Sequence, residues 1–264
     1  MYAFDYKKVA SLEDAQKVFE SADDGTFMAG GMTLIPTLKQ RLASPTDVID
    51  LDGIDELRGI NVDSHSVTIG AMTCHADVAA SSDVKKAIPA LAHLASLIGD
   101  PQVRNRGTIG GSIANNDPAA DYPGALVGLG ATVHTTKKTV SADDFFTGMF
   151  ETALEENELV TKVSFPIPEK AAYQKFPNPA SRYAVVGAFV AKTSDGIRVA
   201  ITGAGPTVFR VPEMEKELTG SFTVDAISDI AVPTHELNSD LHATAEYRAH
   251  LIGVMAKRAV ADCG

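Results

Sequence analysis

The sequence predicts an α+β fold, in which helices alternate with short strands before a β-hairpin near the start of the last third of the chain. Three segments carry this prediction. A capped helix is expected at about 12–21, and a strand, a glycine turn and a helix follow one another between residues 26 and 42. Asp195-Gly196 separates two apolar segments in the way that a two-residue hairpin turn does.

The helices are predicted from their caps and from apolar spacing. Ser11 is followed by acidic residues of a first helical turn and then by apolar residues at helical intervals. Proline suits the first turn of a helix, as at Pro36, and also divides an Ala- and Leu-rich segment at Ile88-Pro89. Helices are therefore expected at about 12–21, at 33–42, in two parts across 76–98, and as an amphipathic helix at about 243–260.

The strands are predicted from short apolar or alternating runs bounded by turn residues. They are expected at 26–29, 48–51, 67–70, 131–133, 159–166, 184–192 and 197–203. Pro166 and Pro168 end the strand at 159–166, and a charged stretch follows. We therefore place a domain boundary there. We therefore expect one domain at 1–168 and a second at 169–264.

Composition narrows the classes of function. The chain has 264 residues, 45% of them hydrophobic, which suffices for a buried core. Its formal net charge of -11 argues against a surface that binds nucleic acid, because such surfaces cluster Lys and Arg. No apolar run has the roughly 20 residues of a membrane helix, and the first residues lack a signal peptide. A cytoplasmic protein is expected.

The glycine pair Gly30-Gly31 lies between an expected strand and an expected helix. Glycines at such a turn let backbone N–H groups approach an anion without side-chain obstruction, and the helix N-terminus adds partial positive charge. The simpler alternative is a tight turn that needs a positive φ. The pattern is neither GxGxxG nor GxxxxGK[ST], so neither a Rossmann fingerprint nor a nucleotide-triphosphate loop is indicated.

A second glycine turn, Thr108-Ile109-Gly110-Gly111-Ser112, adds hydroxyl groups to the same pattern. The polar run Asn115 to Pro123 follows it at once, and buried amides and carboxylates need partners. This combination indicates that a polar ligand binds there, with a surface loop of Asx-turns as the alternative.

Four segments follow one another in the chain: AGGMTLIP, TIGAMTCHADVA, IGDPQVRNRGTIGGSIANNDPAADYPGALVGLGA and ELVTKVSFP. Together they resemble the medium, FAD-binding subunit of the molybdenum hydroxylases, the group of aerobic carbon monoxide dehydrogenase, xanthine dehydrogenase and aldehyde oxidase. The similarity runs in order and spacing from about residue 3 to residue 205, and more loosely to the end.

The resemblance implies a fold and a set of FAD-binding residues. The fold is the α+β FAD-binding fold of the vanillyl-alcohol oxidase type, with two α/β subdomains at about 1–55 and 56–168, followed by a C-terminal domain with a small antiparallel sheet and helices. The two glycine turns are expected to clasp the FAD diphosphate, and Tyr183 to cover the flavin face. The full set of cofactor-binding residues is Ala29, Gly30, Gly31, Met32, Thr33, Ile98, Thr108, Ile109, Gly110, Gly111, Ser112, Asp121, Val160 and Lys175.

Several of these residues have ordinary structural alternatives. The alternative for Asp121 is a helix cap, and for Lys175 a charge on the surface. For Ile98 and Val160 it is packing in the core, and for Tyr183 packing at the start of a strand. The seven histidines lack the spacing of a catalytic or metal site and are assigned no role as a base.

The resemblance also implies partners. In this family the substrate reacts at a molybdenum cofactor in a large subunit, and electrons pass through two [2Fe-2S] clusters of a small subunit to FAD. Such clusters need about four thiolates each, and this chain has two cysteines, Cys74 and Cys263. The chain is therefore expected to be one subunit of a heterotrimer that pairs with a second copy and passes electrons to an external acceptor.

Two other functions stay open at this stage. One is a stand-alone FAD-dependent reductase or oxidase, which would need its own base and substrate-binding arginine. The other is a non-catalytic module that binds a nucleotide diphosphate. The resemblance implies that the large subunit sets the substrate of the whole enzyme, and it leaves the acceptor open, since NAD, a quinone, a cytochrome and oxygen each serve some relatives.

Overall fold

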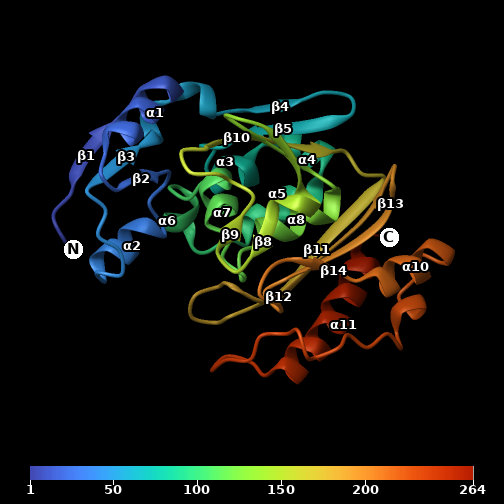
Figure 1. Ribbon diagram of the computed structural model, residues 1–264. Coiled ribbons are helices and arrows are strands. Elements are labelled where there is room, and N and C mark those ends of the chain that lie inside the picture. The colour runs from blue at the N-terminus through green and yellow to red at the C-terminus, as the bar shows by residue number, and fades with distance from the viewer. Residues whose placement is uncertain (264) are drawn as a thin grey trace.

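The computed structural model describes residues 1–263 and shows an α+β protein made of three sheet-containing units that follow one another along the chain (Figure 1). The predicted α+β class and the predicted small antiparallel sheet in the C-terminal part are both confirmed. Within the described residues, no helix has the length and apolar character that crossing a membrane requires.

The N-terminal unit is a three-stranded parallel sheet in the order β1-β3-β2, coloured blue in Figure 1. Ser11 caps the first helix by accepting a hydrogen bond from the backbone N–H of Asp14 (3.1 Å), as the sequence predicts. The elements of this unit are β1 (Asp5–Lys8), α1 (Leu12–Ser21), β2 (Gly25–Met28), α2 (Leu34–Lys39), β3 (Asp47–Asp50), and the 3₁₀ turns η1 (Leu51–Gly53) and η2 (Asp55–Leu57).

Helix α2 ends three residues earlier than the expected 33–42. Arg41 adopts a left-handed conformation (φ 61°), and the N–H of Leu42 donates to the carbonyl oxygen of Thr37 (3.1 Å). This six-to-one hydrogen bond around a left-handed residue is the Schellman motif that closes a helix. Because glycine usually occupies the left-handed position, the arginine concealed this stop in the sequence.

The second unit is a five-stranded antiparallel sheet in the order β4-β5-β10-β6-β7, with helices packed against it. The segment 76–98 contains a further break at Ser81, which caps α4 by accepting from the N–H of Val84 (3.2 Å), so three helices replace the expected two. The elements are β4 (Ile60–Val62), β5 (Ser66–Gly70), α3 (His75–Ala80), α4 (Ser82–Ala87), α5 (Pro89–Ser96), α6 (Pro101–Arg104), α7 (Ile109–Asn115), α8 (Tyr122–Leu129), β6 (Thr132–Thr135), β7 (Thr139–Ser141), α9 (Ala142–Phe145), β8 (Phe146–Gly148), β9 (Glu151–Thr152) and β10 (Val160–Pro166).

The C-terminal unit is a four-stranded antiparallel sheet in the order β11-β12-β13-β14. Its central strands form the predicted hairpin: Thr193 pairs with Gly196, which leaves Ser194-Asp195 as the two-residue loop, one position before the expected one. Helix α11 packs on β11 and β12, while α8 of the second unit packs on β12 and β13, which joins the two units. The elements are β11 (Lys170–Pro177), β12 (Ala184–Thr193), β13 (Gly196–Thr202), β14 (Phe209–Arg210), α10 (Pro212–Gly220), the 3₁₀ turn η3 (Asp225–Ile227) and α11 (Ala245–Asp262).

Candidate functional site

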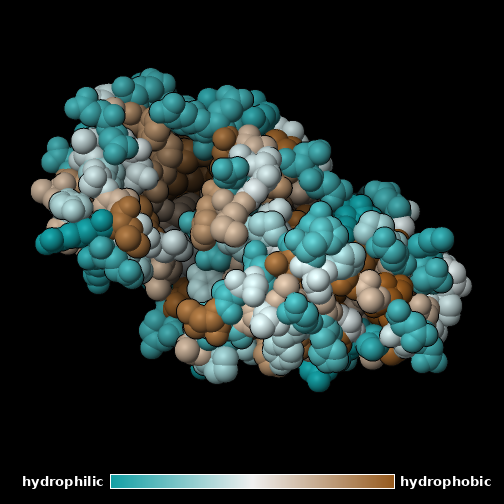
Figure 2. Space-filling view, turned by 60° about the horizontal axis from the view of Figure 1, so that its bottom comes forward, coloured by the Kyte–Doolittle hydropathy of each residue, from teal (hydrophilic) through white to brown (hydrophobic). Residues whose placement is uncertain are grey.

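A cleft of about 700 Å³ lies between the N-terminal unit and the second unit. Figure 2 shows it as a hollow with brown, apolar walls. Its volume falls within the range of about 300–1,000 Å³ that is usual for ligand and cofactor sites. Thirteen of the fifteen residues that the sequence singled out line this cleft: Ala29, Gly30, Gly31, Met32, Thr33, Ile98, Thr108, Gly110, Gly111, Ser112, Asp121, Val160 and Tyr183.

The two remaining residues lie behind the wall of the cleft. Ile109 is fully buried in the core of the second unit at the start of α7. Lys175 lies in β11, and its side chain is only 3% exposed. The structure therefore brings the two glycine turns together, and it places Lys175 behind the side chains that form the cleft surface.

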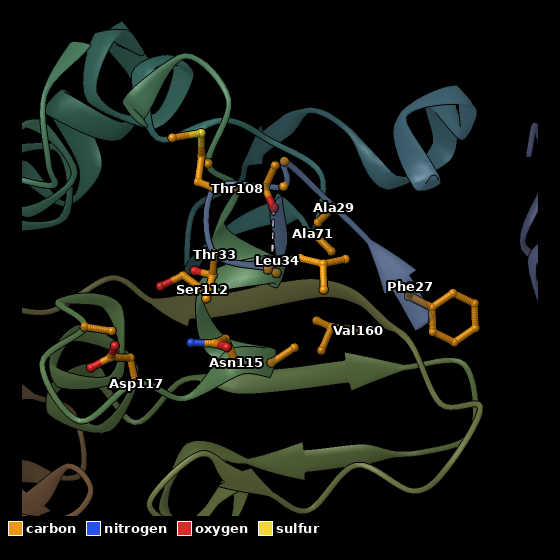
Figure 3. A pocket seen from close by; sticks show the side chains of 18 of the residues that line it. Phe27, Ala29, Thr33, Leu34, Ala71, Thr108, Ser112, Asn115, Asp117 and Val160 are labelled. Carbon is orange, nitrogen blue, oxygen red and sulfur yellow. Dashed lines mark hydrogen bonds between the residues drawn. The ribbon is translucent and has the colours of Figure 1, made fainter. Parts of the chain in front are cut away.

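The two glycine turns pack against one another because their glycines lack a Cβ. A Cβ on Gly30 would lie 1.8 Å from the carbonyl oxygen of Arg106, just before the second turn. A Cβ on Gly111 would lie 3.1 Å from the Cβ of Ala29 in the first turn. Figure 3 shows Ala29 and Thr33 of the first turn beside Thr108 and Ser112 of the second. These two glycines therefore serve the close approach of two backbones.

Four of the five backbone N–H groups of the second turn donate to acceptors within the protein. The N–H groups of Ile109 and Gly110 donate to the carbonyl oxygens of Thr73 (3.2 Å) and Ala71 (2.8 Å). The N–H of Gly111 donates to Oγ1 of Thr108 (3.1 Å), which caps α7. The N–H of Ser112 donates to the carbonyl oxygen of Thr108 (3.0 Å). Because these four amides have acceptors within the protein, the turn presents the hydroxyls of Thr108 and Ser112 to the cleft.

The first turn presents the opposite arrangement. Among residues 1–263, the backbone N–H groups of Gly30, Gly31, Met32 and Thr33 donate to no protein acceptor. Gly31 has φ +75°, a left-handed conformation that side chains disfavour, and a Cβ there would lie 2.7 Å from Cδ1 of Ile35. A run of successive free amides is a binding arrangement for an anionic group such as a phosphate. The first turn therefore has the amides, and the second has the hydroxyls.

Asp121 stands at the start of α8, where it contributes both to the cleft wall and to a buried network. Its side chain makes no capping bond to the helix. One carboxylate oxygen accepts from the Lys175 ammonium (2.9 Å), which also donates to the carbonyl oxygen of Leu97 (3.1 Å), and the other accepts from the Tyr173 hydroxyl. Burial raises the pKa of Asp121, and the Lys175 ammonium and the Tyr173 hydroxyl act against that rise.

His75 is buried under the second glycine turn and also lines the cleft. Burial, with a smaller effect of the Arg104 guanidinium, lowers the pKa of His75 to about 4. Gly107 makes room for the ring, since a Cβ there would lie 2.6 Å from Nε2 of His75. The histidine is therefore neutral near pH 7.

The far end of the cleft contains residues that sequence reasoning missed. Phe27 of β2 stacks on Phe19 of α1, with ring centroids 4.8 Å apart, and both line the cleft. Leu57, Met72 and Leu154 add further apolar surface there. Each of them is an ordinary apolar residue in its own segment, so only the fold reveals that they share one cavity.

Tyr183 stands at the other end of the cleft, just before β12, with 44% of its surface exposed. A tight loop holds it: the N–H of Asn178 donates to the carbonyl oxygen of Tyr183 (2.8 Å), and the N–H of Arg182 donates to the carbonyl oxygen of Asn178 (2.9 Å). Partial burial raises the pKa of Tyr183, and the nearby carboxyl groups of Asp117 and Asp121 raise it further. A neutral aromatic ring thus lies at the end of the cleft.

These features define a dinucleotide-sized site between two α/β units, and the comparisons with known proteins identify its family. Residues 2–168 match the FAD binding domain in molybdopterin dehydrogenase, and residues 171–263 match the CO dehydrogenase flavoprotein C-terminal domain. The chain belongs to the FAD-binding medium subunits of the molybdenum hydroxylases, as its sequence motifs indicated.

Similar proteins cover the chain almost completely. The carbon monoxide dehydrogenase medium chain of Hydrogenophaga pseudoflava is 36% identical over 274 residues, covering 97% of this chain and 96% of its own. The nicotine 6-hydroxylase medium subunit of Paenarthrobacter nicotinovorans is 34% identical, covering 99% and 98%. The solved carbon monoxide dehydrogenase of H. pseudoflava superposes with a TM-score of 0.89 at 36% identity, covering 98% of this chain and 96% of that one. The chain is accordingly an oxidoreductase subunit with an FAD-binding domain.

Proposed function

We propose that this chain binds FAD in the cleft, receives electrons from iron–sulfur clusters of a small subunit, and passes them to an external acceptor. The molybdenum cofactor belongs to a large subunit in this proposal, and the three chains form a heterotrimer that pairs with a second copy. When bound, FAD supplies the isoalloxazine ring, which exchanges electrons one at a time and so links carriers of one and two electrons.

The observation that carries the proposal is the run of free amides from Gly30 to Thr33, opposite the hydroxyls of Thr108 and Ser112. Four amides and two hydroxyls on facing turns suit a diphosphate, which has several acceptor oxygens and no donors at neutral pH. Asp121 lines the cleft, and in this proposal its carboxylate accepts hydrogen bonds from the hydroxyls of a ribityl chain.

The apolar walls suit the two ring systems of FAD. Phe27 and its neighbours form an aromatic and aliphatic cavity at one end of the cleft. Ile98, Val160 and Tyr183 supply apolar and aromatic surface elsewhere along the wall. In this proposal Lys175 acts through Asp121, because it lies behind the wall and its ammonium is 2.9 Å from that carboxylate.

The partners are proposed from family membership and from the chain's own composition. The relatives are named as medium chains or subunits of dehydrogenases and hydroxylases, and no group of His, Cys, Asp and Glu in the described residues is arranged to hold a metal. The catalytic metal and the clusters would therefore reside in other chains.

A visible spectrum and a co-purification experiment test the two parts of the proposal. The purified chain is expected to carry or take up one FAD and to absorb in the blue and near-ultraviolet. An affinity-tagged chain is expected to bring down a large chain and a small, cluster-bearing chain. A colourless protein that takes up no FAD on reconstitution refutes the first part. A flavin-loaded chain that oxidises a substrate by itself refutes the second part, the dependence on partner chains. It would favour the alternative of a stand-alone FAD-dependent reductase or oxidase.

A further inference from the structure

The Asp121 carboxylate, which the proposed function places on the ribityl chain of FAD, is held from the C-terminal unit. Asp121 lies at the start of α8 in the second unit, but both donors to its side chain among residues 1–263, Tyr173 and Lys175, belong to β11. These two residues are two positions apart in one strand, so their side chains leave the same face of the sheet. A group of the proposed cofactor site therefore depends on side chains of the unit that follows it.

The Tyr173 hydroxyl lies in a space that the C-terminal sheet leaves open for it. Tyr173 is 1% exposed, and its ring packs against that of Phe189 in β12, with the ring centroids 6.1 Å apart. A Cβ on Gly187, two residues before Phe189 in the same strand, would lie 2.4 Å from the hydroxyl oxygen. The hydroxyl therefore fills a gap that only glycine leaves, which is more than packing of the ring requires.

Asp121 keeps acceptor capacity toward the cleft. The Tyr173 hydroxyl donates to Oδ1, and the Lys175 ammonium donates to Oδ2. A carboxylate offers about four acceptor positions, so each oxygen retains one. Because each oxygen has its own donor, the carboxylate cannot rotate without breaking a hydrogen bond. Asp121 lines the cleft, whereas its two donors lie behind the wall.

We propose that Tyr173 is a positioning residue for FAD: its hydroxyl fixes the Asp121 carboxylate so that the remaining acceptor positions serve the ribityl hydroxyls. The C-terminal unit thereby completes the FAD site. Tyr173 does not touch the cofactor and acts through Asp121. The inference rests on the proposed function, because it requires FAD in the cleft. Loss of the Tyr173 hydroxyl should weaken binding of the ribityl part of FAD and leave binding of the diphosphate part unchanged.

The test compares the Kd values of FAD and of ADP for the flavin-free full chain. ADP is the part of FAD that contains the adenosine and both phosphates, and it has no ribityl chain. Tyr173→Phe keeps the ring and removes the hydroxyl. It is expected to raise the Kd of FAD about fivefold, as loss of one hydrogen bond does, and to leave the Kd of ADP unchanged.

Tyr122→Phe is the matched control for Tyr173→Phe. Tyr122 is fully buried and follows Asp121 directly in the chain. Its hydroxyl has no hydrogen-bond partner among residues 1–263, so its removal changes no contact of the Asp121 carboxylate. Both Kd values should therefore equal those of the unmodified protein.

A pH series separates positioning from packing. The charged and titratable groups around Asp121 are Lys175 and Tyr173 on β11, Tyr122 on α8 and Tyr183 before β12. Burial raises the pKa of Asp121 and the Tyr173 hydroxyl opposes that rise, so Tyr173→Phe should raise this pKa further. Because a protonated carboxyl is a weaker acceptor, the affinity for FAD should begin to fall at a higher pH in Tyr173→Phe than in the unmodified protein. Loss of ring packing alone would not move that pH.

Hydrogen exchange tests the inference without any substitution. If FAD is held through Asp121, it should slow amide exchange in β11 of the unmodified protein more than ADP does. An unchanged Kd of FAD in Tyr173→Phe, or an equal rise in the Kd of FAD and of ADP, overturns the inference and leaves Tyr173 a packing residue. Exchange in β11 that FAD and ADP slow equally also overturns it. Failure of the unmodified protein to bind FAD instead refutes the proposed function.

Discussion

Replacing Lys175 by methionine leaves the Asp121 carboxylate without its counter-charge. The side chains of Asp121 and Lys175 are only 4% and 3% exposed, and the ammonium lies 2.9 Å from the carboxylate. Removing one partner of a buried ion pair costs about 3–5 kcal/mol, because the other charge stays buried and unpaired. We expect Lys175→Met to lower the free energy of unfolding by about that amount at pH 7.

The same variant should recover stability in acid, and the sign follows from linkage. Burial already raises the pKa of Asp121, and removing the Lys175 ammonium removes a group that opposes that rise. When the folded pKa exceeds the unfolded one, the folded state binds more protons between the two values, so stability falls as the pH rises through that window. The deficit of Lys175→Met should therefore be largest above the folded pKa of Asp121 and should shrink as the pH falls through it.

Urea unfolding at several pH values, in excess FAD, measures this effect with bound ligand held constant. The matched variant is Asp121→Asn with Lys175→Met, which removes both charges and keeps an oxygen that accepts from the Tyr173 hydroxyl. We expect the double variant to be more stable than Lys175→Met at pH 7. The reasoning fails if Lys175→Met lowers the free energy of unfolding by less than about 1 kcal/mol, or if the loss grows as the pH falls. Either result would show that the ion pair with Lys175 does not stabilise the ionised Asp121 carboxylate.

Three further predictions concern the cleft and its surroundings. Gly111→Val places a branched side chain between Ala29 and Thr108 and should abolish FAD retention. Gly253→Val is the control, because no atom lies within 4 Å of a Cβ at that position on α11, and it should retain FAD. Equal flavin content in the two folded variants counts against the placement of the diphosphate at this turn. Tyr183→Ala should keep FAD and change its reduction potential or oxygen reactivity, and no change in either leaves Tyr183 a packing residue. Asn116→Ala should lower the free energy of unfolding, measured by urea unfolding, by about 1–3 kcal/mol. It removes the side-chain amide that donates to two carbonyl oxygens of the β8–β9 turn. An unfolding midpoint equal to that of the unmodified protein contradicts this account.

The sequence predicted the elements whose determinants are local. The cap at Ser11, the turn before Gly196 and the apolar spacing of α11 depend on residues a few positions apart, and the structure has these elements close to where they were expected. The end of α2 at Arg41 and the break at Ser81 were missed, because neither residue is a glycine or a proline. Local rules thus placed these elements, failed at two atypical ends, and left others unpredicted, among them β11 and α10.

The sequence predicted those residues of the candidate site that lie in recognisable motifs, but not the residues that reach the site through long-range packing. Motifs and family resemblance identified thirteen residues that line one cleft, although they lie between positions 29 and 183. The partner of Lys175 was not predictable, since Asp121 is 54 residues away and meets it through packing of the second unit on the C-terminal sheet. Phe27 was missed for a similar reason, because an apolar residue in a strand does not indicate which cavity it faces.

The two glycine turns look equivalent in the sequence and differ in the structure. In the second turn, Gly110 lets α7 approach the strand end, where a Cβ would lie 2.5 Å from the Cβ of Ala71, and its N–H is bonded to the Ala71 carbonyl oxygen. In the first turn, Gly31 provides the positive φ that leaves successive amides free. A substitution at Gly110 therefore disturbs the packing of α7 before it reaches any ligand, which makes Gly111 the better probe of the cleft. The glycine spacing alone cannot separate these roles, because close packing and anion binding both require the absence of a Cβ.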